Sequence, residues 1–302
     1  MKQVIIDTGG AADEAVAILM ALREPTVKVH AITTGHGKAG VEQANHNALL
    51  AVYCAQSYTA PVYQGIAKPL LGGITDTGWV TSVERTEGAD YRAPTQQMEK
   101  EHAVDAMVRL VGENPGEIDL LCLGPLTNIA YAMLQFPQVV KKVAHITMLG
   151  GAHFYNNAFT ACAEFNILAD PEAASIVFGF GVPLTLVIRD VGKNGSAALN
   201  AQEMEQLRVL GEVGSLFMHS DAQLELPAAA AFAVLVKPQL VKSSFTSETI
   251  IDLGGKFTRG TTIFRRQRAY FESAPVQFNS TVVTEVVGQD FKRYVFGLMR
   301  EE

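Results

Sequence analysis

The chain has 302 residues, of which 18% are charged and 48% apolar, and its formal net charge is −7. Because the balance is acidic and no run of lysine and arginine occurs, we expect no nucleic-acid partner. No apolar run reaches membrane-spanning length and none resembles a signal peptide, so we expect a cytoplasmic protein without a membrane segment. Cys54 and Cys122 lie in apolar segments, as is typical of reduced core cysteines.

Strand and helix patterns alternate along the chain. Apolar and β-branched runs predict strands at 4–7, 27–34, 61–63, 117–123, 143–149, 183–188, 248–253, 257–264 and 276–286. Helical spacing of apolar residues predicts helices at 13–23, 41–55, 100–113, 126–136, 171–179, 201–213, 227–233 and 290–299. No linker or charge block divides the chain. The pattern therefore predicts one α/β domain, residues 1–302, with a doubly wound, mostly parallel sheet and helices on both of its faces.

Acidic residues surround the end of the first predicted strand. The run Val4-Ile5-Ile6 ends at Asp7, and Asp13 and Glu14 open the first helix after a short loop. Open α/β sheets bind ligands at the carboxyl ends of their strands, so these acids are candidate site residues. Acids in a first helical turn also suit the helix dipole, and a capping role for Asp13 and Glu14 stays open.

The segment Gly35-His36-Gly37-Lys38-Ala39-Gly40 follows a predicted strand and precedes a helix, which is the setting of a dinucleotide-binding motif. Such a motif also needs an acid about twenty residues further on. No Asp or Glu occurs between Glu42 and Asp76. We therefore expect no NAD site, and a tight turn explains the glycines.

Polar residues follow other predicted strands too. Leu123-Gly124-Pro125-Leu126-Thr127-Asn128 forms a strand-to-helix turn, and Glu164-Phe165-Asn166 precedes the helix that begins at Asp170-Pro171. If 164–166 is extended, Glu164 and Asn166 project to the same side and could bind hydroxyl groups. Each of these residues, taken singly, could equally cap a helix or brace a turn.

Together, these blocks resemble the inosine–uridine-preferring nucleoside hydrolases. The blocks that carry the resemblance keep the family's order: Asp7-Thr8 with Asp13-Glu14, 47–49, 61–65, 123–130, 150–152, 164–166, 170–174 and 258–262. The resemblance implies a doubly wound fold, a homodimer or homotetramer, and cleavage of the N-glycosidic bond of ribonucleosides. It also implies a calcium ion that holds the ribose diol and a water, with an aspartate as the base.

The resemblance also assigns roles to residues of this chain. It implies that the ribose is held by Asp13, Glu164 and Asn166. The family's further asparagine falls on Ala158, and Asn157, one position away, is the candidate for its role. It implies a metal site made of Glu14, Asp7 and a main-chain carbonyl of Leu126 or Thr127. Asp190 matches the acid of a late strand-end motif in the family.

Two departures concern the chemistry. The family's opening motif is Asp-x-Asp-Pro-Gly-x-Asp-Asp, and its second aspartate, the base and a calcium ligand, falls on Gly9. The family's His-Asp pair, which protonates the leaving group and binds calcium, falls on Pro227-Ala228. His219 and Asp221 could replace that pair only if their loop is rebuilt.

His36 stands where the family has an asparagine, and it could act as a base or simply pack within its glycine turn. Two hypotheses stay open for the chain as a whole. It is an N-glycosidase that does not use the ordinary calcium route, or it is an inactive nucleoside- or ribose-binding pseudoenzyme or regulatory paralogue.

Overall fold

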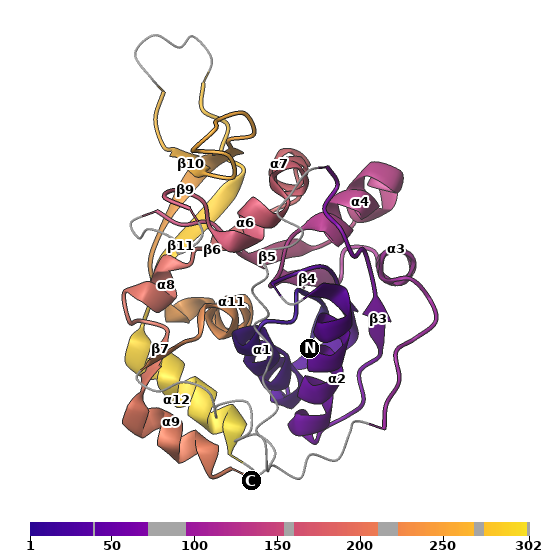
Figure 1. Ribbon diagram of the computed structural model, residues 1–302, viewed down its shortest axis with the longest axis vertical. Helices are drawn as coiled ribbons and strands as arrows, with labels where there is room; N and C mark the ends of the chain where they lie inside the picture. The colour runs from indigo at the N-terminus through magenta and orange to yellow at the C-terminus, as the bar shows by residue number, and fades with distance from the viewer. Residues whose placement is uncertain (39, 72–94, 154–159, 211–222, 269–274, 301–302) are drawn as a thin grey trace.

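The computed structural model describes residues 1–38, 40–71, 95–153, 160–210, 223–268 and 275–300 (Figure 1). Nine strands form one sheet in the order β10-β9-β11-β6-β5-β4-β1-β2-β3. Their bounds are β1 Lys2–Thr8, β2 Val27–Thr34, β3 Val62–Gln64, β4 Ile118–Cys122, β5 His145–Leu149, β6 Leu184–Val187, β9 Val241–Ile251, β10 Thr262–Arg265 and β11 Ser280–Val286. All neighbouring strands are parallel except β9, which runs antiparallel to both β10 and β11.

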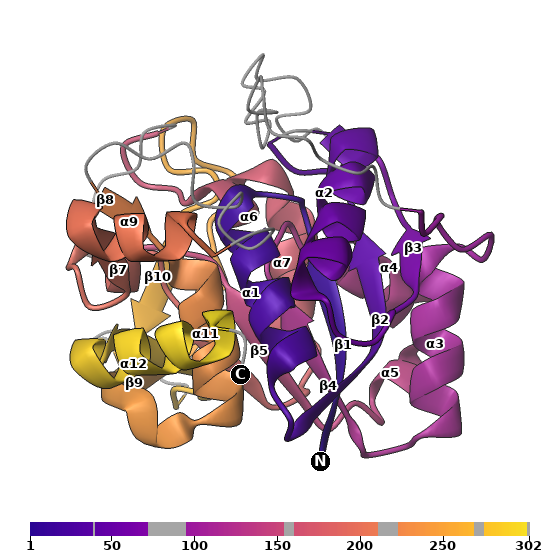
Figure 2. The same cartoon turned by 90° about the horizontal axis from the view of Figure 1, so that it is seen from below.

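Helices cover both faces of the sheet, as predicted. One face carries α1 Ala12–Arg23, α2 Gly40–Ala55, α9 Ala201–Arg208, α11 Pro227–Val236 and α12 Gly288–Met299. The other carries α3 Ala103–Glu113, α4 Thr127–Gln135, α5 Pro137–Val140 and α7 Pro171–Gly179. Figure 2 shows α1 between α2 and α11. In β1, Val4 and Ile6 belong to the first apolar core and Ile5 to the second, so the period-two alternation of a strand feeds both layers.

The strand order fixes where a ligand site can form. The chain runs from β1 outward through β2 and β3, and then returns to the other side of β1 for β4, β5 and β6. The carboxyl ends of β1 and β4 therefore border a topological switch point, where open α/β sheets have their binding crevice. The short helices α6 Phe165–Ala169 and α8 Asp190–Lys193 lie after β5 and β6 at this same end.

Several boundaries differ from the prediction. Strand β9 begins at Val241, not 248, because its first half is polar and is held by pairing with the distant β11. Strand β10 begins only at Thr262, since the preceding residues form a turn in which Gly260 has a φ of 81°. An unpredicted antiparallel pair joins β7 Ala198–Asn200 to β8 Gln223–Glu225. These elements depend on partners far along the chain, which local patterns do not record.

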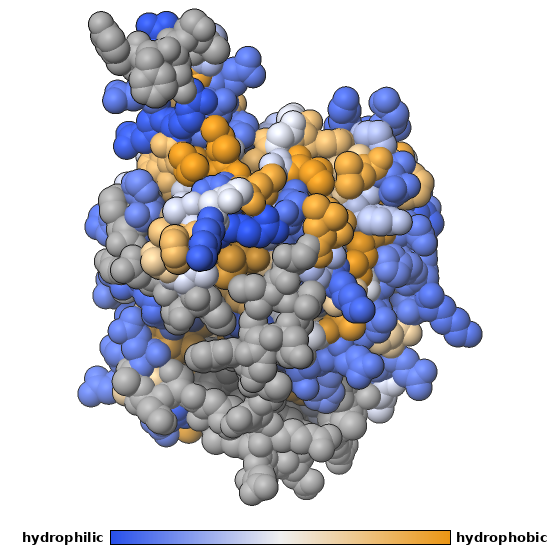
Figure 3. All heavy atoms as spheres, turned by 45° about the horizontal axis from the view of Figure 1, so that its top comes forward, coloured by the Kyte–Doolittle hydropathy of each residue, from blue (hydrophilic) through white to orange (hydrophobic). Residues whose placement is uncertain are grey.

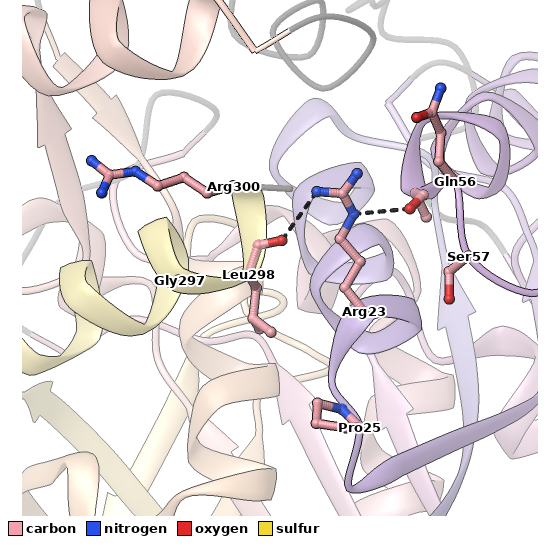
Figure 4. A pocket seen from close by; sticks show the side chains of 8 residues that line it. Arg23, Pro25, Gln56, Ser57, Gly297, Leu298 and Arg300 are labelled. Carbon is pink, nitrogen blue, oxygen red and sulfur yellow. Dashed lines mark hydrogen bonds between the residues drawn. The ribbon is translucent and has the colours of Figure 1, made fainter. Parts of the chain in front are cut away.

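One arginine joins three helices at the opposite end of the sheet (Figure 4). Arg23 ends α1, and its Nε donates a hydrogen bond of 2.8 Å to the carbonyl of Ala55, the last residue of α2. Its Nη1 donates to the carbonyls of Leu298 and Met299, at the end of α12, over 3.2 and 2.9 Å. A cation suits helix C-termini, so Arg23 ties the three helices together.

Other surface features concern the edges of the molecule. In Figure 1, β9 and β10 lie at one end of the sheet and β3 at the other. Exposed apolar side chains lie on and beside the β9–β10 hairpin at Ile250, Leu253, Phe257 and Ile263. Figure 3 shows hydrophobic surface where this end joins the rest of the protein.

No described helix is long and apolar enough to cross a bilayer. The organisation as one domain stays a prediction.

Candidate ligand-binding site

A polar pocket lies at the carboxyl ends of β1, β4, β5 and β6. The loop after β1, the start of α1, the turn between β2 and α2 and the start of α6 all contribute to its wall. Five charged side chains line it: Asp13, Glu14, Glu164, Lys38 and Arg189. The pocket therefore occupies the switch point and combines carboxylates with cations, an arrangement that can bind a polar, hydroxylated ligand.

Glu14 is held by the loop that follows β1. Its Oε2 accepts hydrogen bonds from Thr8 Oγ1 at 2.5 Å and from the main-chain amides of Gly9 and Gly10 at 2.8 and 3.0 Å. Burial and the nearby carboxylate of Asp13 raise the pKa of Glu14 to about 8. One oxygen of this carboxyl group is thus committed to fixing the loop.

Asp7 fixes the strand ends beside the pocket. Its Oδ1 accepts hydrogen bonds from Thr33 Oγ1 at 2.6 Å and Asn128 Nδ2 at 2.8 Å. Asn128 also donates to the carbonyl of Thr34 at 3.0 Å and accepts from the amide of Ile66 at 2.9 Å. Burial outweighs these hydrogen bonds and raises the pKa of Asp7 to about 6. Asp7 is therefore part of a buried network that joins β1, β2 and the start of α4.

Glu164 and Asn166 both line the pocket, but not from an extended segment. That expectation is wrong, because α6 begins at Phe165 and Glu164 is its N-cap. Glu164 Oε2 accepts hydrogen bonds from the amides of Asn166 and Gly151 at 2.9 and 3.1 Å. Asn166 Nδ2 donates to the carbonyls of Leu123 and Leu149 at 2.7 and 3.2 Å. The capping bond favours a helical turn over an extended strand.

Two cations share the pocket with these acids. The guanidinium of Arg189 contacts Glu225 at 3.0 Å; burial lowers its pKa, but Asp13, Glu164 and Glu225 outweigh burial and raise it. Lys38 lies 5.1 Å from the ring centroid of Phe165. Neither cation was predicted to belong to the site. A basic residue in a turn at the carboxyl end of a strand is the signal that could have identified Lys38.

His36 lies beside the pocket but is not one of the residues that line it. Its Nε2 is 2.6 Å from Thr127 Oγ1, whose hydroxyl donates to Asp170 Oδ2 over another 2.6 Å. Burial lowers the pKa of His36. Asp170 also caps α7 by accepting from the amide of Ala173 at 3.1 Å. The imidazole therefore joins the turn after β2 to the starts of α4 and α7.

Gly9 in the loop after β1 packs closely against Gly37 in the turn after β2. A Cβ on Gly37 would collide with the carbonyl oxygen of Gly9. A Cβ on Gly9 would lie 3.2 Å from both Gly37 Cα and Pro125 Cδ, which is tighter than ordinary contact. This approach of two backbones explains why position 37 in the turn after β2 is a glycine.

The start of α11 contacts the pocket through a main-chain group. The amide of Ala228 donates to Asp13 Oδ2 at 3.4 Å, and Pro227 occupies the first turn, where its missing amide costs no hydrogen bond. Asp13 thus interacts with the positive end of a helix. Asp13 therefore joins α1 to α11 across the pocket.

Comparison with known proteins identifies the family to which this fold belongs. The family model of the inosine-uridine preferring nucleoside hydrolases matches residues 4–293. The chain belongs to the nucleoside hydrolase family. It is 40% identical over 188 residues to probable uridine nucleosidase 1 of Oryza sativa subsp. japonica, covering 61% of this chain and 57% of that relative's length. It is 32% identical over 271 residues to the non-specific ribonucleoside hydrolase RihC of Salmonella newport (strain SL254), covering 86% of each. The solved plant nucleoside hydrolase PpNRh1 superposes with a TM-score of 0.83 at 26% identity, covering 100% of this chain and 99% of that one.

The predicted residues of this nucleoside hydrolase family member fall into three groups. Asp13, Glu14, Glu164 and Asn166 meet in the pocket. Asp7, His36, Leu126, Thr127 and Asp190 lie outside its lining, and Asn157, His219 and Asp221 lie outside the described residues. The carbonyl of Leu126 accepts the helical hydrogen bond of the Ala130 amide at 2.9 Å, and Asp190 accepts from the amide of His153 at 3.0 Å. Over the described ranges, no three His, Cys, Asp or Glu side chains are arranged to hold a metal ion.

Proposed function

We propose that this chain binds the ribose of a nucleoside-like ligand in the pocket, and that it does so without the calcium-assisted hydrolysis implied by the resemblance. The observation that carries the proposal is the set of charges in the pocket. The carboxyl groups of Asp13 and Glu164 can accept hydrogen bonds from sugar hydroxyls, and the cations Lys38 and Arg189 can donate to them. Such a mixed set of donors and acceptors is chemically complementary to a neutral polyol.

The residues present do not fit calcium. A calcium ion takes about six to eight oxygen ligands. Gly9 and Ala228 bring no carboxylate, and one oxygen of Glu14 already accepts three hydrogen bonds. Lys38 and Arg189 add positive charge to the same space and would repel a divalent cation.

Hydrolysis without a metal is the second candidate function. The carboxylates of Asp13 and Glu164 line one pocket, and carboxylates can stabilise the positive charge that develops on a sugar when its glycosidic bond breaks. In that case Asp13 would be the residue placed to activate a water. The two candidates differ in one measurable property, the release of free ribose.

The test measures binding and turnover separately. Uridine, inosine, 2′-deoxyuridine and free ribose are titrated into the protein by calorimetry in EDTA, and ribose release is followed with and without calcium. We expect binding of the ribonucleosides in EDTA, weaker binding of the 2′-deoxy compound, and no calcium-dependent release. Release that EDTA abolishes would contradict the proposal. Release in EDTA that is lost in Asp13→Asn would instead establish the second candidate.

A further inference from the structure

We propose that Lys38 is the internal cation of the ribose pocket: its ammonium group balances the carboxyl groups there, so that the pocket holds a protein cation where the resemblance implies a metal ion. The inference rests on the proposed function, because it explains how the pocket can bind a sugar without calcium. It assigns a specific role to a residue that the family resemblance does not mark.

The position of Lys38 is fixed by the packing of two turns. The residue follows Gly37, whose backbone lies directly against that of Gly9 in the loop after β1. This contact brings the turn between β2 and α2 over the pocket, and the Lys38 side chain joins Glu14 and Glu164 in its wall. Its charge favours the ionised forms of both carboxyl groups. A side-chain cation therefore faces acids from two different parts of the chain.

Arg189, the other cation of the pocket, forms an ion pair with a residue outside the pocket lining. Arg189 is paired with Glu225 at 3.0 Å, and Lys193 contacts the same carboxylate at 2.9 Å. Arg189 is thus shared between the pocket and the β8 segment outside it. Lys38 instead extends from the turn beside Gly9, the position where the resemblance leads us to expect a metal-binding aspartate.

The count of charged groups gives the consequence of removing this lysine. Three carboxyl groups, those of Asp13, Glu14 and Glu164, share the pocket with Lys38 and Arg189. Without the Lys38 ammonium, one arginine would face three carboxyl groups, of which Glu14 carries a proton below its pKa of about 8. A pocket with that balance should attract a small divalent cation, since the repulsive charge has gone and oxygen atoms remain. An ammonium group also has three donors, which suits the oxygens of a sugar diol.

The test uses calcium alone as the probe. The full chain and the variants Lys38→Met and Lys38→Arg are titrated with calcium chloride by calorimetry, and their melting temperatures are compared in calcium and in EDTA. Methionine keeps the length and apolar stem of the lysine, and circular dichroism checks that each variant is folded. Lys141→Met is the matched control, because Lys141 is exposed and its replacement removes the same charge from the surface.

We expect wild type, Lys38→Arg and Lys141→Met to be indifferent to calcium and EDTA. Lys38→Met should bind calcium at least about tenfold more tightly than wild type, with a calcium-dependent rise in melting temperature. The inference is overturned if wild type and Lys38→Met respond alike, whether both bind calcium or neither does. A wild-type protein that binds no nucleoside would refute the proposed function, and this calcium comparison would still decide the role of Lys38.

Discussion

Replacing Gly9 by the family's aspartate should lower the stability of the protein and should not produce calcium-dependent activity. One reason is steric and the other is electrostatic. Gly9 does not have a positive φ, so its backbone accepts any residue and the space around it decides the outcome. A Cβ there would lie 3.2 Å from Gly37 Cα and Pro125 Cδ, and both neighbours belong to backbone or to a rigid ring. We therefore expect Gly9→Ala to lower the free energy of unfolding by about 1–2 kcal/mol through overpacking.

The change Gly9→Asp adds a charge to the same crowded position. Gly9 lines the pocket, and its amide is 2.8 Å from Glu14 Oε2. A carboxylate at position 9 would therefore enter a pocket that already holds Glu14 and Glu164. We expect a total loss of about 3–5 kcal/mol, because Lys38 and Arg189 already face three carboxyl groups and leave a further buried charge uncompensated. We also expect no calcium-dependent release of ribose, because Lys38 and Arg189 would still repel a divalent cation.

The assay is urea unfolding at neutral pH, followed by circular dichroism, with ribose release measured on the same preparations. Gly297→Ala is the control, because Gly297 lies in α12, where an added Cβ would meet no atom within 4 Å, and this change should gain about 0.5–1 kcal/mol. A Gly9→Asp protein with wild-type stability and calcium-dependent activity would refute both the packing argument and the proposed loss of the calcium route.

Three further changes test the fold around the site by urea unfolding. Arg23→Ala should cost about 2–3 kcal/mol, because it removes hydrogen bonds to the ends of two helices, whereas the exposed Arg300→Ala beside it should change stability by less than about 0.5 kcal/mol. Asn128→Ala should cost about 3–5 kcal/mol, since it removes three hydrogen bonds, one of them to the buried carboxyl group of Asp7. Tyr294→Phe should cost about 1–2 kcal/mol at neutral pH, because it removes the 2.6 Å hydrogen bond to Glu24. Burial raises the pKa of Glu24, but its hydrogen bonds outweigh burial and lower that pKa. The stabilisation by this hydrogen bond is therefore present above the ordinary pKa of 4.5 and should disappear as the pH falls below that value. A cost of Tyr294→Phe that is independent of pH would contradict the role of Glu24.

Much of the fold could be predicted because its signals are local. Helix 13–23 and strand 27–34 appear at nearly their predicted bounds, since their apolar residues follow the period of the element and an acid or a turn marks the end. Strand β9 and the β7–β8 pair could not be bounded in the same way. Their polar sequences are held in extended form by neighbours more than twenty residues away, and a pattern within one segment carries no record of that pairing.

The acids of the pocket could be predicted for a similar reason. Asp13 and Glu14 follow the end of a buried strand, and the parallel sheet brings such strand ends together. The conformation of 164–166 was predicted wrongly, because Glu164 bonds the backbone of the residue two places on and so begins a helix. Lys38 and Arg189 were missed because a cation in a pocket expected to bind a metal ion contradicts the family pattern, and only the folded chain shows that both face the same acids.

The departures at positions 9 and 228 both make the pocket less negative. The resemblance leads us to expect carboxylates at positions 9 and 228, and the chain has Gly9 and Ala228 there, while Lys38 contributes a positive charge to the same pocket. The amide of Ala228 also donates to Asp13, so the positive end of α11 now faces a carboxylate. One oxygen of buried Glu14 accepts three hydrogen bonds, which offset part of the cost of burying a carboxyl group. Loss of a metal ion alone would leave acids unbalanced; here the balance is restored by groups of the protein, which is why the charge of Lys38 is the decisive one to remove.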